Sequence, residues 1–539
     1  MVESNQQDRG FTGKQWLFGS AVVIALLLLL IYGVERYLEQ NLQGKLQDAG
    51  HDFRDSNYEL ELGDLQLSLW GQDLTVSDLE IFPTSTGMDS AHIAPSRIKT
   101  IAVKDIGLIS YFWGDTLSIG EIVIHQPDLI LKGRVRRTTE DDTLSPGSKT
   151  GKKIPAVKIG SIQVVNGSAR ILHPSDSTEE AAIDHLDVQV QGVTIDPSTV
   201  AQLPFLRFDS IDGEVTGFHT QTPGNFYDIS LRKFSISSSD STAALDSLVV
   251  TPRHPKYKFA QQYGFEIDRI DLAIPQIRLH GLQSNQLLHN RFEATYLELK
   301  NAEMEVFHDK HMPASPKKRR PLLHEALARL PFTVELDSVS VEGSQITYTE
   351  HRPRVPEPGS VIFGDLNAKI YNLSNDSLIS ANEKSIILEA HSAIMNSAPL
   401  SVRATFPMHN TDMHSLEGSL GEMSMQQLNP VLEPLGFVSI TSGQIHSMEF
   451  KMDLTTEAAN GRLLLNYSGL KIEVLKPEQV DKGGDKELLS MLVNIKVKSE
   501  NRSQPLREGE ISFKRDPQKS IFNYWWKSLL SGLKSTIGL

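Results

Sequence analysis

The sequence predicts a mostly β protein: an elongated, repetitive antiparallel sheet of bulged strands that curls into a groove, with an N-terminal transmembrane helix and a C-terminal amphipathic helix. Three observations support this prediction. A charge-free apolar segment lies near the N-terminus, short runs of alternating apolar residues recur from residue 57 onward, and sequences typical of helices are scarce among those runs.

The composition permits a folded body and excludes several kinds of site. Of the 539 residues, 39% are hydrophobic and 22% are charged, which is typical of ordered chains. The formal net charge of -14 makes nucleic acid a poor partner, because phosphate binding needs clustered Lys and Arg. The chain has no cysteine, which excludes disulfides, thiol catalysis and thiolate metal ligands.

Residues 16–34 are predicted to form the transmembrane helix. This segment, WLFGSAVVIALLLLLIYGV, contains no charge, and a helix of its length nearly matches a hydrocarbon core of about 30 Å. We expect Leu26 and Leu29 to anchor it within the bilayer and the rings of Trp16 and Tyr32 to lie near the two interfaces. A cleaved signal peptide is the alternative, but no small-x-small cleavage pattern follows the apolar segment.

The flanks of this segment predict its orientation. Arg9 and Lys14 precede it, so residues 1–15 are expected to be cytoplasmic and the body to be translocated. Leucines recur at four-residue spacing within residues 35–56, which we interpret as a helical extension out of the bilayer.

A strand repeat organises residues 57–349, the predicted β-groove region. Each run places apolar residues at relative positions 0, 2, 5 and 7. The step of three would turn the second half of a strand to the opposite face unless one extra residue forms a β-bulge. Pairs such as Gly120-Glu121 and Gly160-Ser161 suit a bulge, and a tight turn between two short strands is the alternative.

Few predicted helices are available to cover the apolar face of this sheet. Short helices are expected at residues 322–330 and within 425–435. The face must therefore close on itself, pack on a second sheet or hold an apolar ligand. For the ligand-holding case, the predicted groove-lining residues are Leu117, Ile119, Ile122, Ile124, Ile267, Ile270 and Leu272.

Charged or Pro-rich breaks at 134–155, 309–321, 350–360 and 476–487 interrupt the strands and separate a second β-region at residues 361–512. The final segment, residues 516–539, is predicted to be an amphipathic helix with Asp516 as N-cap and Pro517 at its first position. Its apolar face would lie at a membrane interface, and docking on the open end of the sheet is the alternative. The interfacial residues are Phe522, Trp525, Trp526, Leu529 and Leu533.

Two stretches resemble the AsmA-like proteins of Gram-negative envelopes. They are LSIGEIVIHQPDLILKG, and LNPVLEPLGFVSITSGQIHSMEF followed by GRLLLNYSGLKIEVL; the second is the more specific. The resemblance implies a single-pass inner-membrane anchor and a periplasmic body. It also implies a relation to bridge-like lipid-transfer proteins, whose sheets curl into a long apolar groove, and hence phospholipid as a partner.

Enzyme signatures are missing from the sequence. It contains no HExxH, GxSxG, P-loop or strand-following dinucleotide motif, so we predict no catalytic residue, metal ligand or cofactor. His308 and His311 flank Asp309-Lys310 and are expected to be solvated loop residues.

The residues leave two functions open, besides an enzyme with an unrecognised site, which the missing motifs disfavour. The first is a groove that binds or conducts lipid. The second is a non-catalytic scaffold or assembly factor for other envelope proteins, with a dry, closed core. A charge at Ile119 or Ile270 should separate them, because it would block lipid in a groove but unfold a closed core.

Overall fold

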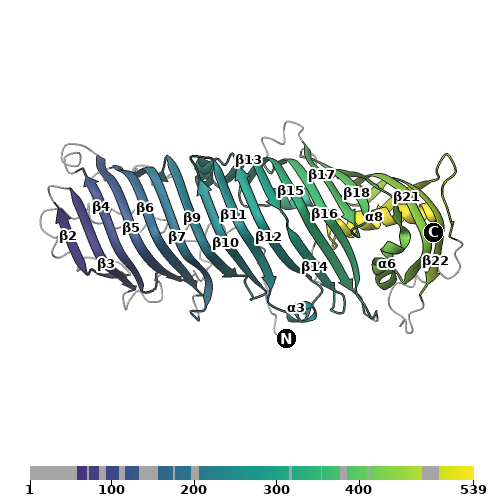
Figure 1. The fold of residues 1–539 in the computed structure, drawn as a ribbon, viewed down its shortest axis with the longest axis horizontal. Coiled ribbons are helices and arrows are strands. Elements are labelled where there is room, and N and C mark those ends of the chain that lie inside the picture. The colour runs from purple at the N-terminus through teal and green to yellow at the C-terminus, as the bar shows by residue number, and fades with distance from the viewer. Residues whose placement is uncertain are drawn as a thin grey trace. The chain divides into compact units, whose positions relative to one another are not determined.

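The computed structural model describes residues 58–68, 72–83, 93–107, 116–132, 156–173, 176–195, 206–314, 319–353, 355–376, 385–408, 413–475 and 497–538. The predicted segments 1–15, 16–34 and 35–56 lie outside these residues. Within the described ranges, no helix has the length and apolarity needed to cross a membrane. The described chain is mostly β-strand, as predicted, and its few helices are short (Figure 1).

The chain divides into two compact units. Unit 1 contains the described residues up to Pro223, with Ile229–Leu245 and Leu282–Asn290. Unit 2 contains Gly224–Asp228, Asp246–Gly281 and the chain from Arg291 onward. The predicted break at 350–360 falls inside unit 2, between two paired strands.

The strands of unit 1 follow one another closely along the chain. They are β1 (Tyr58–Glu61), β2 (Asp64–Ser68), β3 (Asp73–Pro83), β4 (Ser96–Ile106), β5 (Thr116–Lys132), β6 (Ala156–Leu172), β7 (Glu179–Ile195), β8 (Leu206–Arg207) and β9 (Ser210–Gln221). Two further strands, β10 (Tyr227–Ser237) and β11 (Thr242–Pro252), draw residues from both units, and the 3-10 helix η3 (Ser284–His289) belongs to unit 1.

Unit 2 contains the longest strands and the described α-helices. Its strands are β12 (Asp268–His280), β13 (Arg291–Lys300), β14 (Glu303–Asp309), β15 (Thr333–His351), β16 (Gly359–Ser374), β17 (Ser385–Ile394), β18 (Ala398–Pro407), β19 (Met413–Leu420), β20 (Met423–Ser424), β21 (Val438–Thr455), β22 (Ala458–Val474) and β23 (Glu508–Lys514). Its helices are α3 (Lys256–Tyr263), α4 (Leu323–Ala328), the 3-10 helix η4 (Met425–Leu428), α6 (Asn429–Gly436) and α8 (Ile521–Ile537). The short helices expected near residues 322–330 and 425–435 are therefore confirmed.

Most neighbouring strands pair in antiparallel fashion, but each unit contains a parallel junction. β5 pairs with β6 in parallel, and β13 and β14 both pair in parallel with β15. A parallel pair needs a crossover of about a dozen residues or more, and the connections here are residues 133–155 and 310–332. The predicted antiparallel sheet is therefore confirmed for most strand pairs, and the parallel pairs across two of the charged breaks in the sequence are the exceptions.

The irregular positions in the strands keep apolar side chains on one face in two ways. Register shifts occur in β6–β7 between Val164 and Ala169, and in β15–β16 between Val341 and Ile346. At Gly120 the apolar spacing changes from two to three residues, but the registers of β4–β5 and β5–β6 stay the same. The neighbouring strands therefore carry the same irregularity at the same place. A Cβ on Gly160 would lie 2.5 Å from the carbonyl oxygen of Gly120, so the close approach of β5 and β6 there excludes a side chain.

Helix α8 begins later than predicted. Ser520, and not Asp516, is its N-cap, and the Ser520 hydroxyl accepts a hydrogen bond from the backbone N–H of Asn523. Asp516 instead lies in the preceding turn, where its carboxylate accepts from the N–H of Gln518. A carboxylate that bonds its own turn is not available to cap a helix that starts five residues further on.

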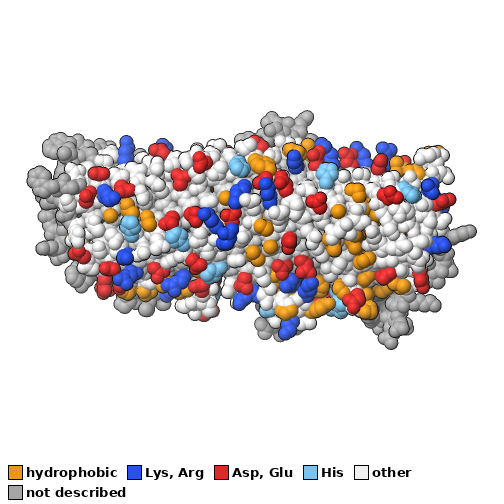
Figure 2. Space-filling model, viewed as in Figure 1, with side chains coloured by type: hydrophobic (Ala, Val, Ile, Leu, Met, Phe, Trp, Pro, Cys, Tyr) orange, Lys and Arg blue, Asp and Glu red, His pale blue; other side chains and the backbone are white. Residues whose placement is uncertain are grey.

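Charged side chains are dispersed over the surface. On the face shown in Figure 2, Lys and Arg are interspersed with Asp and Glu. In unit 2 one row of directly opposed residues crosses five strands with mixed charge, and Lys451 contacts Glu417 at 3.2 Å within it. The row is Glu389, Arg403, Glu417, Lys451 and Arg462. Such exposed cross-strand pairs each contribute roughly 0.2–1 kcal/mol.

Candidate functional site

The four predicted groove residues of β5 lie in a closed hydrophobic core. Leu117, Ile119, Ile122 and Ile124 are all buried, in one cluster with the inner side chains of neighbouring strands. One row of directly opposed residues shows how continuous this apolar face is: Leu74, Val103, Ile122, Ile162, Val190 and Ile211. Ile122, Ile162 and Val190 in this row are buried and Leu74, Val103 and Ile211 are half-buried, so unit 1 has a packed interior around β5, β6 and β7.

The predicted groove residues around β12, in unit 2, are less covered. Ile270 is 36% exposed, and Ile267 and Leu272 are half-buried. Ile270 and Leu272 each begin a row of opposed apolar side chains across β12, β14, β15 and β16, and every further member of the two rows is half-buried. The rows are Ile270, Val306, Tyr348 and Val361, and Leu272, Met304, Ile346 and Phe363. We call these eight residues the apolar strip.

The strip belongs to the inner face of the unit 2 sheet. Phe363 is opposite Ile394 of β17, and Ile394 packs against the hydrophobic cluster that contains α8. From β12 to β17 the second row crosses four strand spacings, or about 19 Å at ~4.8 Å each. That exceeds the ~15 Å half-thickness of a bilayer hydrocarbon core, so the row is long enough to accompany an acyl chain.

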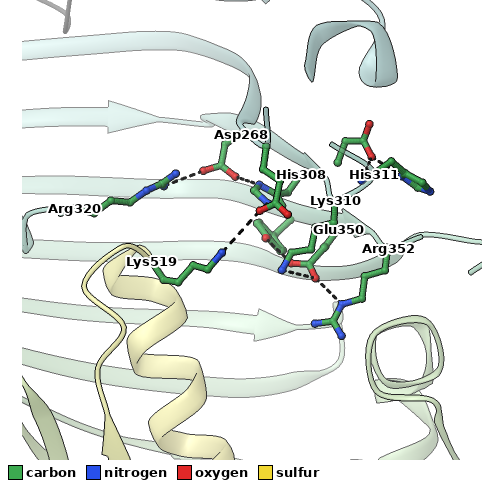
Figure 3. A network of polar contacts seen from close by, with 11 residues as sticks. Asp268, His308, Lys310, His311, Arg320, Glu350, Arg352 and Lys519 are labelled. Carbon is green, nitrogen blue, oxygen red and sulfur yellow. Dashed lines mark hydrogen bonds and ion pairs between the residues drawn. The ribbon is translucent and has the colours of Figure 1, made fainter. Parts of the chain in front are cut away.

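A polar row borders the apolar strip one step along the strands. Asp268, His308 and Glu350 are directly opposite one another on β12, β14 and β15. His308 Nδ1 lies 2.7 Å from Asp268 Oδ1, and its Nε2 lies 3.6 Å from Glu266 Oε2 (Figure 3). His308 is therefore part of a strand and largely buried, which corrects the expectation that it is a solvated loop residue.

Glu350, the third residue of the polar row, contacts three side chains. Arg352 Nε donates to Glu350 Oε1 at 2.9 Å, Lys310 Nζ lies 3.4 Å from the same oxygen, and the Tyr348 hydroxyl donates to Oε2 at 3.2 Å. Tyr348 thus joins the apolar strip to the polar row, because its ring lies in the strip and its hydroxyl bonds Glu350. We call the polar row, together with Glu266 and the cations that contact these carboxylates, the network.

Two cations approach the network from segments that precede helices. Arg320, before α4, lies 3.7 Å from Asp268 Oδ2, and Lys519, before α8, lies 3.8 Å from Glu266 Oε2 (Figure 3). Their side chains remain 40% and 42% exposed. These two long, partly solvated contacts differ from the shorter bonds of the buried members.

The environment keeps Asp268 and Glu350 ionised. Burial is the largest influence on the pKa of Asp268 and by itself raises it, but the hydrogen bond and charge of His308, with Arg320, bring the pKa below its usual value. At Glu350 burial likewise raises the pKa, and Lys310, Arg352 and His308 outweigh it. Burial first, and then Glu350, raises the pKa of the Tyr348 hydroxyl, which therefore stays protonated.

This network was not predicted from the sequence, although one signal for it was present. The alternation of Met304, Val306 and His308 is the pattern of a one-faced strand, and it places His308 on the apolar side. No sequence signal places Lys519 beside Glu266, because the two residues are distant in the chain and meet only through the fold.

The C-terminal helix docks on the sheet through a face of mostly small residues. The buried residues of α8 are Ile521, Tyr524, Ser528, Gly532 and Thr536, and the helix contacts β22 and β23 (Figure 1). A Cβ on Gly532 would lie 2.7 Å from Ile511 Cγ1, so the glycine permits this close packing. The hydroxyls of Ser531 and Ser535 accept from the backbone N–H groups of Ser512 and Glu510.

The predicted interfacial residues of α8 separate into two groups. Phe522 and Trp526 are exposed, Phe522 by 64%. Trp525, Leu529 and Leu533 are half-buried and pack against the hydrophobic cluster of unit 2. The helix thus docks on the sheet and still presents two aromatic rings to solvent.

A buried histidine holds the docked helix. His414 Nε2 accepts a hydrogen bond from Trp525 Nε1 at 3.0 Å, and its ring stacks on Phe406 with 5.1 Å between centroids. Burial, with the neighbouring charges of His324 and Arg515, lowers the pKa of His414 to about 3. The ring is therefore neutral at ordinary pH.

The predicted anchor residues Trp16, Leu26, Leu29 and Tyr32 lie outside the described residues. Within the described part of the chain, no group of three or more His, Asp or Glu side chains is arranged to hold a metal ion. Searches with protein-family models and against curated proteins return no match to this chain. The resemblance to AsmA-like proteins stays a prediction from the residues.

Proposed function

We propose that this protein binds lipid, most directly phospholipid, on the apolar strip of unit 2. The supporting observation is that two aligned apolar rows of the inner face are half-buried and that Ile270, at the start of one row, is 36% exposed. Burying such side chains beneath an acyl chain removes apolar surface from water, which favours binding by about 25 cal/mol per Å². No catalytic group is required, because apolar burial alone holds the ligand.

The cellular setting is proposed from the sequence. A single-pass anchor at 16–34 and the AsmA-like resemblance favour a bacterial inner-membrane protein with its bulk in the periplasm, where it would bind or conduct lipid for envelope homeostasis. The groove of that family corresponds best, in this chain, to the strip of unit 2.

A scaffold role is the second candidate, and the closed core of unit 1 favours it for that part of the chain. Side chains such as Ile122, with no exposed surface, leave no apolar face free for lipid at those positions. Unit 1 would then serve as a rigid body that recruits other envelope proteins.

Substituting Ile270 tests the lipid proposal. The full-length wild type, Ile270→Asp and conservative Ile270→Leu proteins are purified from envelopes, and bound phospholipid is quantified after washing. We expect wild type and Ile270→Leu to retain lipid, and Ile270→Asp to lose at least about tenfold in occupancy while its circular dichroism is unchanged, because a carboxylate disfavours contact with an acyl chain. Lipid around the anchor is common to all three proteins, so equal occupancy in all three would contradict the proposal.

A further inference from the structure

The apolar strip ends at a set of cations that are held at its border. The ion-paired network contains four cations, Lys310, Arg320, Arg352 and Lys519, and three carboxylates, Glu266, Asp268 and Glu350. Apart from His308, these four positive and three negative side chains leave an excess of one positive charge. A local positive excess contrasts with the net charge of -14 of the whole chain.

The cations differ in how firmly they are engaged. Lys310 and Arg352 share one well-buried carboxylate, Glu350, at 3.4 and 2.9 Å. Arg320 and Lys519 contact their carboxylates at 3.7 and 3.8 Å and keep 40% and 42% of their side-chain surface exposed. An arriving anion can therefore bind Arg320 and Lys519 without first breaking a short, buried ion pair.

The order of chemistry along the sheet is that of an amphiphile. Moving along β12, the side chains on the inner face change from Leu272 and Ile270, in the apolar strip, to Asp268, in the network. Tyr348 and Glu350 make the same transition on β15. A molecule with an acyl chain on the strip would place its polar end beside Arg320 and Lys519.

We propose that the network is a headgroup site, and that Arg320 and Lys519 bind the phosphate of a phospholipid whose acyl chain lies on the apolar strip. This inference rests on the proposed lipid-binding function and names the part of the lipid that is recognised. Arg binds phosphate through a planar fork of N–H donors and Lys as a mobile point charge, so the two together suit one phosphodiester. A lipid without phosphate would use the strip but not the network.

The test compares two lipids and two pairs of substitutions in the full-length protein. Displacement of a fluorescent phosphatidylglycerol is measured with unlabelled phosphatidylglycerol and with diacylglycerol of the same acyl chains. We expect phosphatidylglycerol to bind wild type about tenfold more tightly than diacylglycerol, since two charge-assisted contacts are added. Arg320→Gln with Lys519→Gln should remove that preference and leave diacylglycerol binding unchanged.

The matched control is Arg403→Gln with Lys451→Gln. It removes the same charge from the opposite face of the unit 2 sheet, at side chains 46% and 61% exposed, and should keep the preference. Equal weakening by both pairs would reduce the effect to general charge attraction and overturn the headgroup site.

Other outcomes distinguish the two proposals. Equal binding of the two lipids by wild type would overturn the headgroup site and leave lipid binding intact. Binding of neither lipid would overturn both. Competition by glycerol phosphate as strong as that by phosphatidylglycerol would assign the network to a soluble anion and overturn the lipid assignment.

Discussion

Among single residues, His414 connects the packing of the C-terminal helix to pH. Its pKa of about 3 in the folded protein lies below the usual value of 6.5. The neutral, buried ring therefore stabilises the fold fully above pH 6.5, and this contribution is lost as the pH falls from 6.5 toward 3. The largest loss that this shift allows is about 5 kcal/mol, from ~1.4 kcal/mol per pH unit.

His414→Gln should remove this dependence, because Gln does not titrate and its carbonyl can still accept from Trp525. Between pH 7 and pH 4.5 we expect the free energy of unfolding of wild type to fall by about 3 kcal/mol more than that of the variant, measured by urea denaturation. His391→Gln is the control: His391 is exposed on the other face of the sheet, and its loss should leave the wild-type difference. Identical pH profiles for His414→Gln and wild type would contradict the argument.

The residue scale also shows what a strand pattern conveys about a side chain. Ile122 and Ile270 occupy the same position in the sequence repeat, yet one is 0% exposed and the other 36%. Alternation predicts that both face inward, which the opposed apolar rows confirm. The exposed fraction of each side chain depends on what packs against it in the folded protein, and the local sequence pattern does not predict that.

At the scale of elements, α8 shows that small side chains, and not only large apolar ones, can form the docking face of a helix. The helix contacts the sheet through Ser528, Gly532 and Thr536, because small side chains allow close approach to β22 and β23. Its serine hydroxyls meet N–H groups of β23, so polar atoms are satisfied at the contact. A prediction based on the position of Trp and Leu alone misses this arrangement.

Gly532→Val should loosen that contact. The new side chain would meet Ile511 and Leu463, which must shift or force the helix away, at a cost of about 1–3 kcal/mol. We expect faster hydrogen exchange at the amides of Glu510 and Ser512, which would lose the Ser535 and Ser531 acceptors. Phe522→Ala, at a largely exposed position on the same helix, should leave those rates unchanged. Unchanged exchange in Gly532→Val would show that the contact tolerates a larger residue.

At the scale of the whole molecule, the inner faces of the two units are covered to different degrees at Ile119 and at Ile270. The core of unit 1 is closed around Ile119, whereas the strip of unit 2 stays partly open at Ile270.

Ile119→Asp should therefore lower the free energy of unfolding by several kcal/mol, roughly 3–5, because the carboxylate would be buried without a partner. We expect the amides of β4–β7 to lose hydrogen-exchange protection, with Ile119→Val, costing about 1 kcal/mol, as the control.

The contrary result for Ile119→Asp is equally informative. A protein that stays protected in β4–β7 but carries less lipid would extend the lipid-binding face into unit 1. A protein that unfolds there, while Ile270→Asp stays folded, would locate the open face in unit 2 alone.

The sequence by itself determined that the chain is mostly β, which side chains of each strand share a face, and where the short helices near residues 322–330 and 425–435 lie. These features depend on neighbours within a few residues, because side chains alternate along a strand and helices have local start signals. Only the tertiary structure decided that two strand junctions are parallel, that one apolar face is closed and another partly open, and that Lys519 and Arg320 meet Glu266 and Asp268. Those features depend on the direction of long crossovers and on contacts between residues far apart in the chain, which no local pattern encodes.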